Sequence, residues 1–408
     1  MSQTFSHEAE FSRPAHADSY QLEAGRWSAG RNALLFVALV SLVLCIFGYT
    51  QNRDRFFQSY LVAFTFTGGI GLGAFFFVMA QHLSGNAATV VVRRIQENLM
   101  VTLPIGALLF LPLAFGLKPV YPWAHPEIAS VTPEIKAKGS YLTENFFVLR
   151  SYGYFLLWSV WVFAIYGQST KQDTTRSVRQ MHIISRWSAP GLFLVVVVGT
   201  LAAYDWLMSV QPTWFSTIFG LYYLADGALA FMAVTTLVCL GFRRAGILSN
   251  SITIEHYHDL GKWLFALTAF YTYIAFAQYL LIWYANLPEE TQFFRLRAQG
   301  GWLWLSLSLP FIRFIIPFFW LLCRPAKRSL TSLGLVASWS LIVVVIDLFW
   351  VVMPVHYPNG PQIHWLDFAT LAFTVSVCGL QFWGRFKKNK MVPVGNLRFE
   401  QSLHFENA

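Results

Sequence analysis

The chain has 408 residues, of which 56% are hydrophobic and only 12% are charged. A soluble globular protein carries roughly 25% charged residues, and half that share is too small to cover the surface of a protein of this length. Ten membrane-crossing helices of roughly 20 residues would use about half the chain and would account for the composition. The sequence therefore excludes a soluble protein and predicts an all-α, polytopic integral membrane protein.

Ten apolar runs are each long enough to cross the hydrocarbon core of a bilayer as a helix. In chain order they cover residues 32–49, 57–83, 98–117, 146–167, 189–210, 214–241, 260–285, 300–322, 330–353 and 365–384. They divide the chain into an N-terminal segment (1–31), a ten-helix membrane domain (32–385) and a C-terminal tail (386–408). The polar N-terminal segment lacks the features of a cleavable secretory signal, so we expect the first run to remain as a helix.

The net charge of +9 could indicate a nucleic-acid partner. With ten spans, however, both termini and every even-numbered connection share one face, and 20 of the 29 lysines and arginines lie there. Eight are counted to the other face and Arg313 alone to the interior of a span. Arg150 and Lys262, near the ends of their runs, are counted with the adjacent connections, and Arg94 lies in a connection between two runs. This unequal division is the positive-inside bias of membrane proteins. We therefore expect both termini in the cytoplasm and no nucleic-acid partner.

The cysteines and histidines lack the spacing of a redox centre. The cysteines lie far apart in apolar runs, which argues against an iron–sulfur cluster or covalent haem and favours small core residues: Cys45, Cys239, Cys323 and Cys378. Only His82 and His258 approach a run, both at its edge, so ligands for a haem between helices are missing. His356 and His364 have no third ligand nearby. We therefore expect this chain to bind no metal and no redox cofactor.

Two further patterns have structural explanations. The second run contains four glycines: Gly68, Gly69, Gly71 and Gly73. They do not form a phosphate-binding loop, which needs a strand and a lysine, and the Gly69–Gly73 spacing instead predicts close helix packing. Tryptophans near the ends of runs predict interfacial belts or packing: Trp123, Trp187, Trp206, Trp214, Trp263, Trp302 and Trp365.

Ionisable residues in or beside the apolar runs are costly there and are candidates for function. They sample the full depth of the membrane: Glu97, His258 and Asp259 at the inner margin, Asp226 and Arg313 in the middle, and Asp205 and Asp347 toward the outer end. Nearby hydroxyls could hold water between them: Tyr204, Tyr222, Tyr223, Thr268, Tyr271 and Thr272. The set predicts either a proton path or ion pairs that fix helix packing, with Asp226–Arg313 the obvious buried pair.

Four stretches resemble one protein family. They are SYLVAFTFTGGIGLGAFFFVMAQHLSGNAATVVVRR (59–94), FLPLAFGLKPVYPWA (110–124), YDWLMSVQPTWFSTIFGLYY (204–223) and HDLGKWLFALTAFYTYIAFAQYLLIWYANLPEET (258–291). The family is the ActF membrane subunit of alternative complex III, a bacterial quinol:electron-acceptor oxidoreductase, within the NrfD/PsrC-like superfamily. The resemblance covers residues 30–385. It implies two four-helix bundles, formed by spans two to five and six to nine, with spans one and ten at the edges.

The resemblance also implies a bacterial inner-membrane complex. Its partners would be a sister NrfD-like membrane subunit, an iron–sulfur and molybdopterin-like subunit and c-type cytochrome subunits, besides lipid. The family subunit carries no redox cofactor, and menaquinol or another quinol is better supported as a ligand of the sister subunit, so quinone-binding residues here are unknown. Our mechanistic hypothesis is that quinol is oxidised near the outer face and electrons pass through partner iron–sulfur clusters to haem c.

Protons would be translocated in parallel through this subunit. Asp226 with Arg313 would be the midpoint of the path. Entry would use Glu97, His258 and Asp259, and exit would use Asp205 and Asp347.

Three alternatives remain open from the sequence. The chain could be the quinone-binding anchor of a polysulfide- or nitrite-reductase-like complex from the same superfamily. It could be a secondary transporter, of which broken helices are typical and for which Pro310 and Pro317 in the eighth run are the only indication. It could also be a scaffold whose buried charges only hold helices together.

Overall fold

A computed structural model describes residues 20–407 of the chain. Ten helices in this range are long and apolar enough to cross a membrane, and no β-strand occurs within it. The chain is an all-α, polytopic membrane protein, and the ten predicted spans are confirmed. The spans are α1 (Ala24–Gln51), α2 (Arg53–Ser84), α3 with α4 (Val90–Met100, Gly106–Phe115), α7 (Glu144–Thr175), α8 (Val178–Trp206), α9 (Phe219–Arg244), α10 (Ile254–Ala285), α12 with α13 (Trp302–Pro310, Ile316–Leu322), α15 (Leu330–Val352) and α16 (Trp365–Gly384).

Several helices are longer than the apolar runs that predicted them. α8 begins at Val178 rather than near residue 189, and α3 begins at Val90 rather than near residue 98. An apolar run measures only the hydrocarbon-crossing part of a helix, whereas these extensions mix apolar residues with charged and polar ones, such as Arg93 and Arg94 of α3. α1 likewise begins at Ala24, inside the predicted N-terminal segment. The remainder of that segment, residues 1–19 with Arg13, lies outside the described residues.

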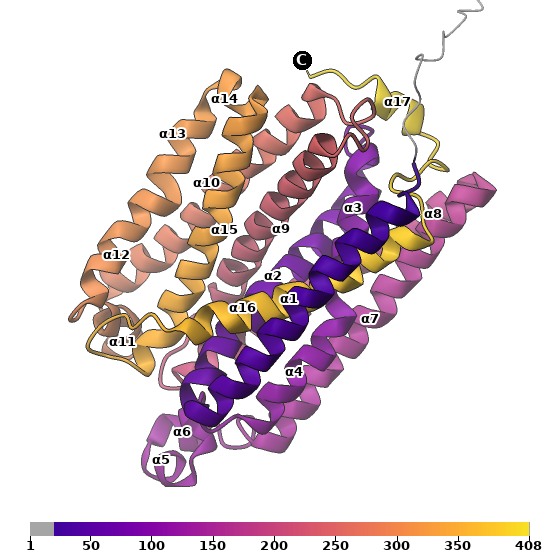
Figure 1. Ribbon diagram of the computed structural model, residues 1–408. Coiled ribbons are helices and arrows are strands. Elements are labelled where there is room, and N and C mark those ends of the chain that lie inside the picture. The colour runs from indigo at the N-terminus through magenta and orange to yellow at the C-terminus, as the bar shows by residue number, and fades with distance from the viewer. Residues whose placement is uncertain (1–19, 408) are drawn as a thin grey trace, which may run out of the picture.

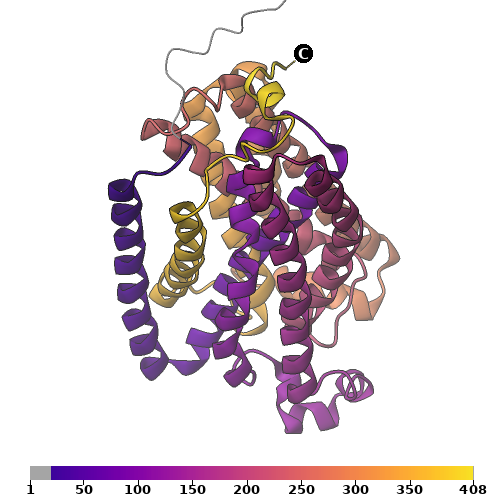
Figure 2. The same cartoon turned by 90° about the vertical axis from the view of Figure 1, so that its right-hand side faces the viewer.

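The spans form two four-helix bundles, as the family resemblance implies. In the first bundle, α2 packs against α3, α4 and α8, and α7 packs against α8. In the second bundle, α9 packs against α10 and α15, while α12 and α13 complete the group. The peripheral helices α1 and α16 lie against each other, and α16 also contacts α2 (Figures 1 and 2).

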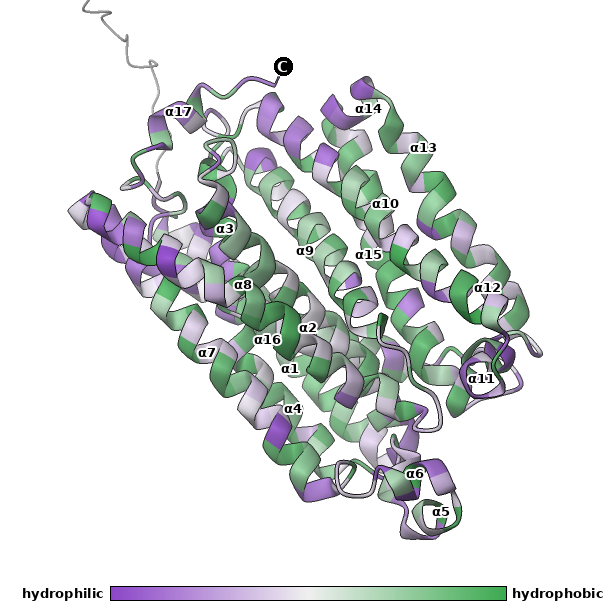
Figure 3. Cartoon of the chain, turned by 180° about the vertical axis from the view of Figure 1, so that it is seen from behind, coloured by the Kyte–Doolittle hydropathy of each residue, from purple (hydrophilic) through white to green (hydrophobic). Residues whose placement is uncertain are grey.

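Both ends of the described chain lie at one face of the molecule, where the Met391 amide donates to the Tyr20 carbonyl at 2.8 Å. We call this the terminal face, and it also carries α14 (Arg324–Arg328) and α17 (Phe399–Leu403) (Figure 1). The opposite face carries α5 (Pro126–Val131), α6 (Pro133–Ala137) and α11 (Pro288–Arg297). Hydrophobic residues dominate the middle of the helices and hydrophilic residues gather toward their ends (Figure 3), as expected for a bilayer-embedded protein.

Glycines allow the two bundles to touch through backbone. A Cβ on Gly73 of α2 would lie 2.6 Å from the Gly227 carbonyl oxygen of α9, and a Cβ on Gly227 would overlap the Gly69 carbonyl. The small-xxx-small spacing of Gly69 and Gly73 therefore brings α2 and α9 together, which confirms the predicted close packing. We call this contact the glycine seam. It places Asp226, the residue before Gly227, beside the join between the bundles.

Four of the seven tryptophans noted near span ends are buried. Trp123, Trp206, Trp214 and Trp302 are at most 4% exposed, so they fill the protein interior. Trp187, Trp263 and Trp365 are between 38% and 43% exposed and lie at the surface, as belt residues do. The expectation that all four cysteines are core residues is wrong for Cys323, which is exposed in the turn between α13 and α14.

The glycine seam makes a specific prediction about stability. Gly227→Ala should destabilise the folded protein by about 1–3 kcal/mol, because the new methyl group meets backbone that cannot move aside. Gly241→Ala, on the same helix, should not destabilise the protein and should stabilise it by up to about 1 kcal/mol, since nothing lies within 4 Å of a Cβ there and alanine favours a helix over glycine. Thermal unfolding of the two purified variants in one detergent measures the difference. Equal unfolding temperatures for the two variants would contradict the close backbone contact at the glycine seam.

Candidate functional site: buried polar clusters in the two bundles

The structure divides the seven candidate residues between the bundles. Glu97 and Asp205 lie in the first bundle, on α3 and α8. The other five lie in the second bundle, and three of these share one network: Asp226, Arg313 and Asp347. Within residues 20–407, no hydrogen bond or ion pair given by the structure joins Glu97 or Asp205 to that network.

The network in the second bundle spans four elements: α9, α10, α15 and the turn η4 (Phe311–Ile315) that carries Arg313. Tyr222 of α9 donates to Oδ2 of Asp347 on α15 at 2.6 Å, and Tyr271 of α10 donates to the Tyr222 hydroxyl at 2.9 Å. The Arg313 guanidinium lies 3.7 Å from the centre of the Tyr271 ring and forms an ion pair with Asp226. We call these five residues the tyrosine network. All are at most 7% exposed, and the expected Asp226–Arg313 pair is confirmed.

A local change of helix type positions Arg313. Pro310 ends α12, and residues Phe311–Ile315 form one π-helical turn, η4, before α13 continues. Proline interrupts the backbone ladder, and π-turns are frequent at functional sites. The indole of Trp339 on α15 donates to the Ile312 carbonyl at 2.7 Å, which satisfies a backbone acceptor inside the membrane region.

Arg297 of α11 lies between the tyrosine network and the opposite face. Its guanidinium donates to the carbonyls of Trp350, Val351 and Phe293 at 3.0, 2.5 and 2.8 Å. It thereby ties α11 to the last turn of α15, one turn beyond Asp347. Burial lowers the pKa of Arg297 to about 9, partly offset by Tyr222 and Asp347. Arg297 therefore stays cationic at neutral pH.

The tyrosine network thins out toward the terminal face. The hydroxyls of Thr268 and Ser340 are the next polar groups on α10 and α15, and each donates to a carbonyl of its own helix four residues back. Beyond them come buried leucines such as Leu264 and Leu333, while α9 contributes the buried hydroxyls of Thr235 and Thr236. His258 is buried near the start of α10, roughly 20 Å along the helix from Tyr271 at 1.5 Å per residue. Asp259 pairs with Lys262 at 3.1 Å near the surface.

Glu97 belongs to a separate cluster in the first bundle. Oε2 of Glu97 accepts from Arg94 at 2.8 Å, and Oε1 accepts from the Ser169 hydroxyl at 2.7 Å and lies 3.4 Å from Nε2 of His82. Arg94 also pairs with Asp173 of α7 at 2.6 Å. Glu97 and Arg94 are fully buried. Each carboxylate has a cationic partner, as buried charges require.

The C-terminal tail covers this cluster at the terminal face. The Gly395 amide donates to Asp173 at 3.3 Å, and the Asn389 amide group donates to the Tyr166 hydroxyl at 2.9 Å. Farther along, Asn407 donates to Glu255 of α10 at 3.1 Å. The tail therefore bridges the terminal ends of both bundles.

Asp205 forms a closed ion pair near the opposite face. Its two carboxylate oxygens accept from Nε and Nη2 of Arg150 at 3.0 and 2.9 Å, and Tyr154 donates to the same carboxylate at 2.7 Å. A bidentate pair of this kind fixes geometry. Arg150 also stacks on the ring of Tyr141 at 3.7 Å. The cluster joins α7 to α8 and has the contacts of a structural brace.

Sequence reasoning missed several partners of these candidates. Arg94 and Arg150 were assigned to connections between spans, but both lie within helices and pair with buried carboxylates. Arg55, which precedes the predicted second run, lies in the first turn of α2 and pairs with Asp367 in the first turn of α16 at 2.5 Å. The Arg94–Glu97 spacing of three residues beside a run of valines was the one available signal. The long-range pairs had no counterpart in the sequence.

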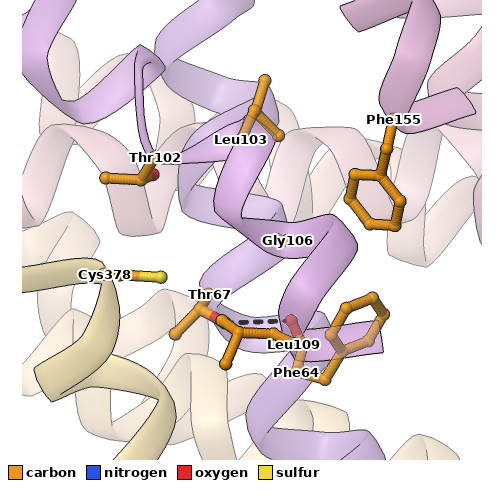
Figure 4. Close-up of a pocket in the computed structure, with 9 residues that line it drawn as sticks. Phe64, Thr67, Thr102, Leu103, Gly106, Leu109, Phe155 and Cys378 are labelled. Carbon is orange, nitrogen blue, oxygen red and sulfur yellow. Dashed lines mark hydrogen bonds between the residues drawn. The ribbon is translucent and has the colours of Figure 1, made fainter. Parts of the chain in front are cut away.

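A small cavity lies in the first bundle between α2, α4, α7 and α16 (Figure 4). Its volume is about 10 Å³, and its lining includes the side chains of Thr67, Thr102, Phe155 and Cys378. That space admits about one water molecule, whereas sites for organic ligands measure hundreds of cubic ångströms. The cavity therefore does not fit a quinol ring.

No known protein family and no curated protein matches the chain. Within residues 20–407, no three histidine, cysteine, aspartate or glutamate side chains lie close enough together to hold a metal ion.

The Asp205 brace makes a prediction that separates a structural pair from a proton carrier. Asp205→Asn and Arg150→Gln should each destabilise the protein, because each leaves a desolvated partner without its counter-charge. The double variant should be less destabilised than the sum of the two, with a coupling on the order of 1–3 kcal/mol. Thermal unfolding of the four proteins closes this double-mutant cycle. Strict additivity would show that the two side chains do not stabilise each other.

Proposed function

We propose that this protein is the cofactor-free membrane subunit of a bacterial quinol:electron-acceptor oxidoreductase of the alternative complex III kind. The resemblance of four long stretches between residues 59 and 291 to that family supports the proposal, and the two four-helix bundles agree with the fold it implies. The protein would lie in the inner membrane with its terminal face in the cytoplasm, which the bias of lysine and arginine favours. Partner subunits would carry the haems and iron–sulfur clusters.

The second part of the proposal is that the tyrosine network conducts protons. The observation that carries it is the series of contacts from Asp347 through the hydrogen-bonded Tyr222 and Tyr271 to the Arg313–Asp226 pair. Because Arg313 meets the ring of Tyr271 and not its hydroxyl, a proton would need water to pass between that hydroxyl and Asp226. Hydroxyls that donate to one neighbour and accept from another can relay a proton. A carboxyl at each end can hold or release it. Arg313 and Arg297 supply the positive charge that lets carboxylates exist in this low-dielectric setting.

This proposal narrows the sequence-based hypothesis to one bundle. Asp205 and Glu97 are each held by an arginine and by hydroxyl donors in the first bundle. These contacts suit a structural role for the two residues. In the second bundle, the path would leave toward the opposite face by Asp347. Its terminal half would need water to reach His258 and Asp259. Buried hydroxyls interrupt the apolar packing there: Thr268 of α10, Ser340 of α15, and Thr235 and Thr236 of α9.

A subunit inventory tests the first part of the proposal. Gentle detergent purification of the native complex should recover c-type haem proteins and an iron–sulfur subunit with quinol:cytochrome c activity. Haem absorption and mass spectrometry identify these partners. Recovery of a polysulfide- or nitrite-reducing subunit instead would favour the reductase-anchor alternative, and recovery of the chain alone would favour a transporter.

Adjacent tyrosines allow a matched test of the proton path. Tyr222→Phe removes the hydroxyl between Asp347 and Tyr271, so it should lower proton release per electron in vesicles containing the assembled complex. Tyr223→Phe is the control, since that hydroxyl donates to the Thr65 carbonyl at the join between bundles at 2.7 Å. The Tyr223→Phe variant should keep the wild-type number of protons released per electron. Equal ratios for wild type and both variants would exclude Tyr222 from the path.

Paired neutralisation then distinguishes conduction from scaffolding. Asp226→Asn with Arg313→Gln removes two opposite charges together and should leave assembly intact while lowering proton release per electron. The matched pair, Asp205→Asn with Arg150→Gln, should leave the ratio unchanged in any complex that assembles. An unchanged ratio for the first pair would assign Asp226 and Arg313 to packing alone.

A further inference from the structure

A hollow at the terminal face lies between the last turn of α9 and the first turn of α15. Its volume is about 270 Å³, and it is lined by Leu240, Arg243, Arg244, Leu330 and Thr331. Leu240 closes its floor, because its Cδ1 lies 3.3 Å from where a Cβ on Gly334 would be. The hollow is far from the tyrosine network, and the proposed function makes no use of it.

The two arginines bring positive charge that no carboxylate neutralises. Arg243 donates to the Ile252 carbonyl at 3.1 Å and the Ser249 carbonyl at 3.4 Å. Arg244 is exposed at the rim. Neither forms an ion pair with any acidic side chain among residues 20–407. Arg243 also lies 5.7 Å from the centre of the Tyr257 ring, so its guanidinium is held in place while its charge is not neutralised. The exposed Arg244 guanidinium is open to an anion.

The other wall of the hollow is the beginning of a long helix. α15 starts at Leu330 after the N-cap Ser329, whose hydroxyl accepts from the Ser332 amide at 3.4 Å. The first amides of a helix lack intrahelical partners, and its dipole favours negative charge there. Thr331, exposed at this end, adds a hydroxyl. The wall thus offers hydrogen-bond donors opposite the two arginines.

An apolar surface continues from the hollow toward the membrane interior. Leu335 lies four residues after Thr331 on the same face of α15, and Ile342 follows two turns later. These side chains are 55% and 58% exposed. An anion with hydrocarbon attached could therefore place its charge in the hollow and its chain along α15. Inorganic phosphate would use only the first of these features.

We propose that this hollow binds the phosphate headgroup of an acidic phospholipid, with an acyl chain along Leu335 and Ile342. Basic pockets between membrane helices are suited to such headgroups. Arg243 and Arg244 supply the charge, Thr331 and the start of α15 supply donors, and Leu240 sets the depth. The lipid would join α9 to α15 at the end of the second bundle.

Lipid titration of the purified full-length chain tests the proposal. Native mass spectrometry would follow binding of phosphatidylglycerol, with phosphatidylcholine and inorganic phosphate as separate arms. Arg244→Gln should weaken phosphatidylglycerol binding about five-fold, the effect of losing one cation near an anionic headgroup. The control is Arg179→Gln, which removes an exposed arginine at the start of α8, on the terminal face. It should change phosphatidylglycerol binding less than about two-fold, because Arg179 does not line the hollow.

The remaining outcomes are equally decisive. Preference for phosphatidylglycerol over phosphatidylcholine, lost in Arg244→Gln and kept in Arg179→Gln, supports the site. Equal losses in both variants would mean general surface attraction and overturn it. Competition by millimolar inorganic phosphate that abolishes lipid binding would show that the apolar stripe contributes nothing, and would overturn the lipid assignment. Circular dichroism of each variant verifies that the helices remain folded.

Discussion

The backbone contact at the glycine seam determines how the rest of the molecule is arranged. Gly69 and Gly73 of α2 meet Gly227 of α9 without intervening side chains. In a bilayer, where lipid is as apolar as leucine, such close van der Waals packing is a main source of helix association. The seam joins the two bundles, and α9 then presents Tyr223 to α2 and Tyr222 and Asp226 to the second bundle.

The cost of charge in a low-dielectric interior explains the differences between the buried clusters. Asp205 is held by a bidentate arginine and a tyrosine, which leaves it little freedom. Asp347 instead accepts from a tyrosine hydroxyl that also accepts from Tyr271. The first arrangement is rigid and closed, whereas the second has hydroxyls that can reorient. This contrast favours the second bundle over the first for the proposed proton transfer.

Much of this could be predicted from the sequence, but unevenly. Asp226 and Arg313 stood out because a charge in an apolar run is rare, and they do pair. The role of Tyr222 and Tyr271 as links could be suggested but not established, because their partners are far away in sequence. Arg94 and Arg150 were misplaced because hydropathy marks where hydrocarbon ends and gives no information on buried partners. Pro310 predicted an interruption, and the structure resolves it as a π-turn.

By itself, the sequence determined the class of protein, the ten spans and the short set of membrane charges, because bilayer thickness and desolvation act on each segment independently. Only the tertiary structure decided which charges meet. It separated Glu97 and Asp205 from Asp226, gave Arg150 and Arg94 their partners and joined Asp347 to Arg313 through two tyrosines. The physical reason is that ion pairs and hydrogen bonds act over a few ångströms, and which helices come that close depends on packing across the whole fold.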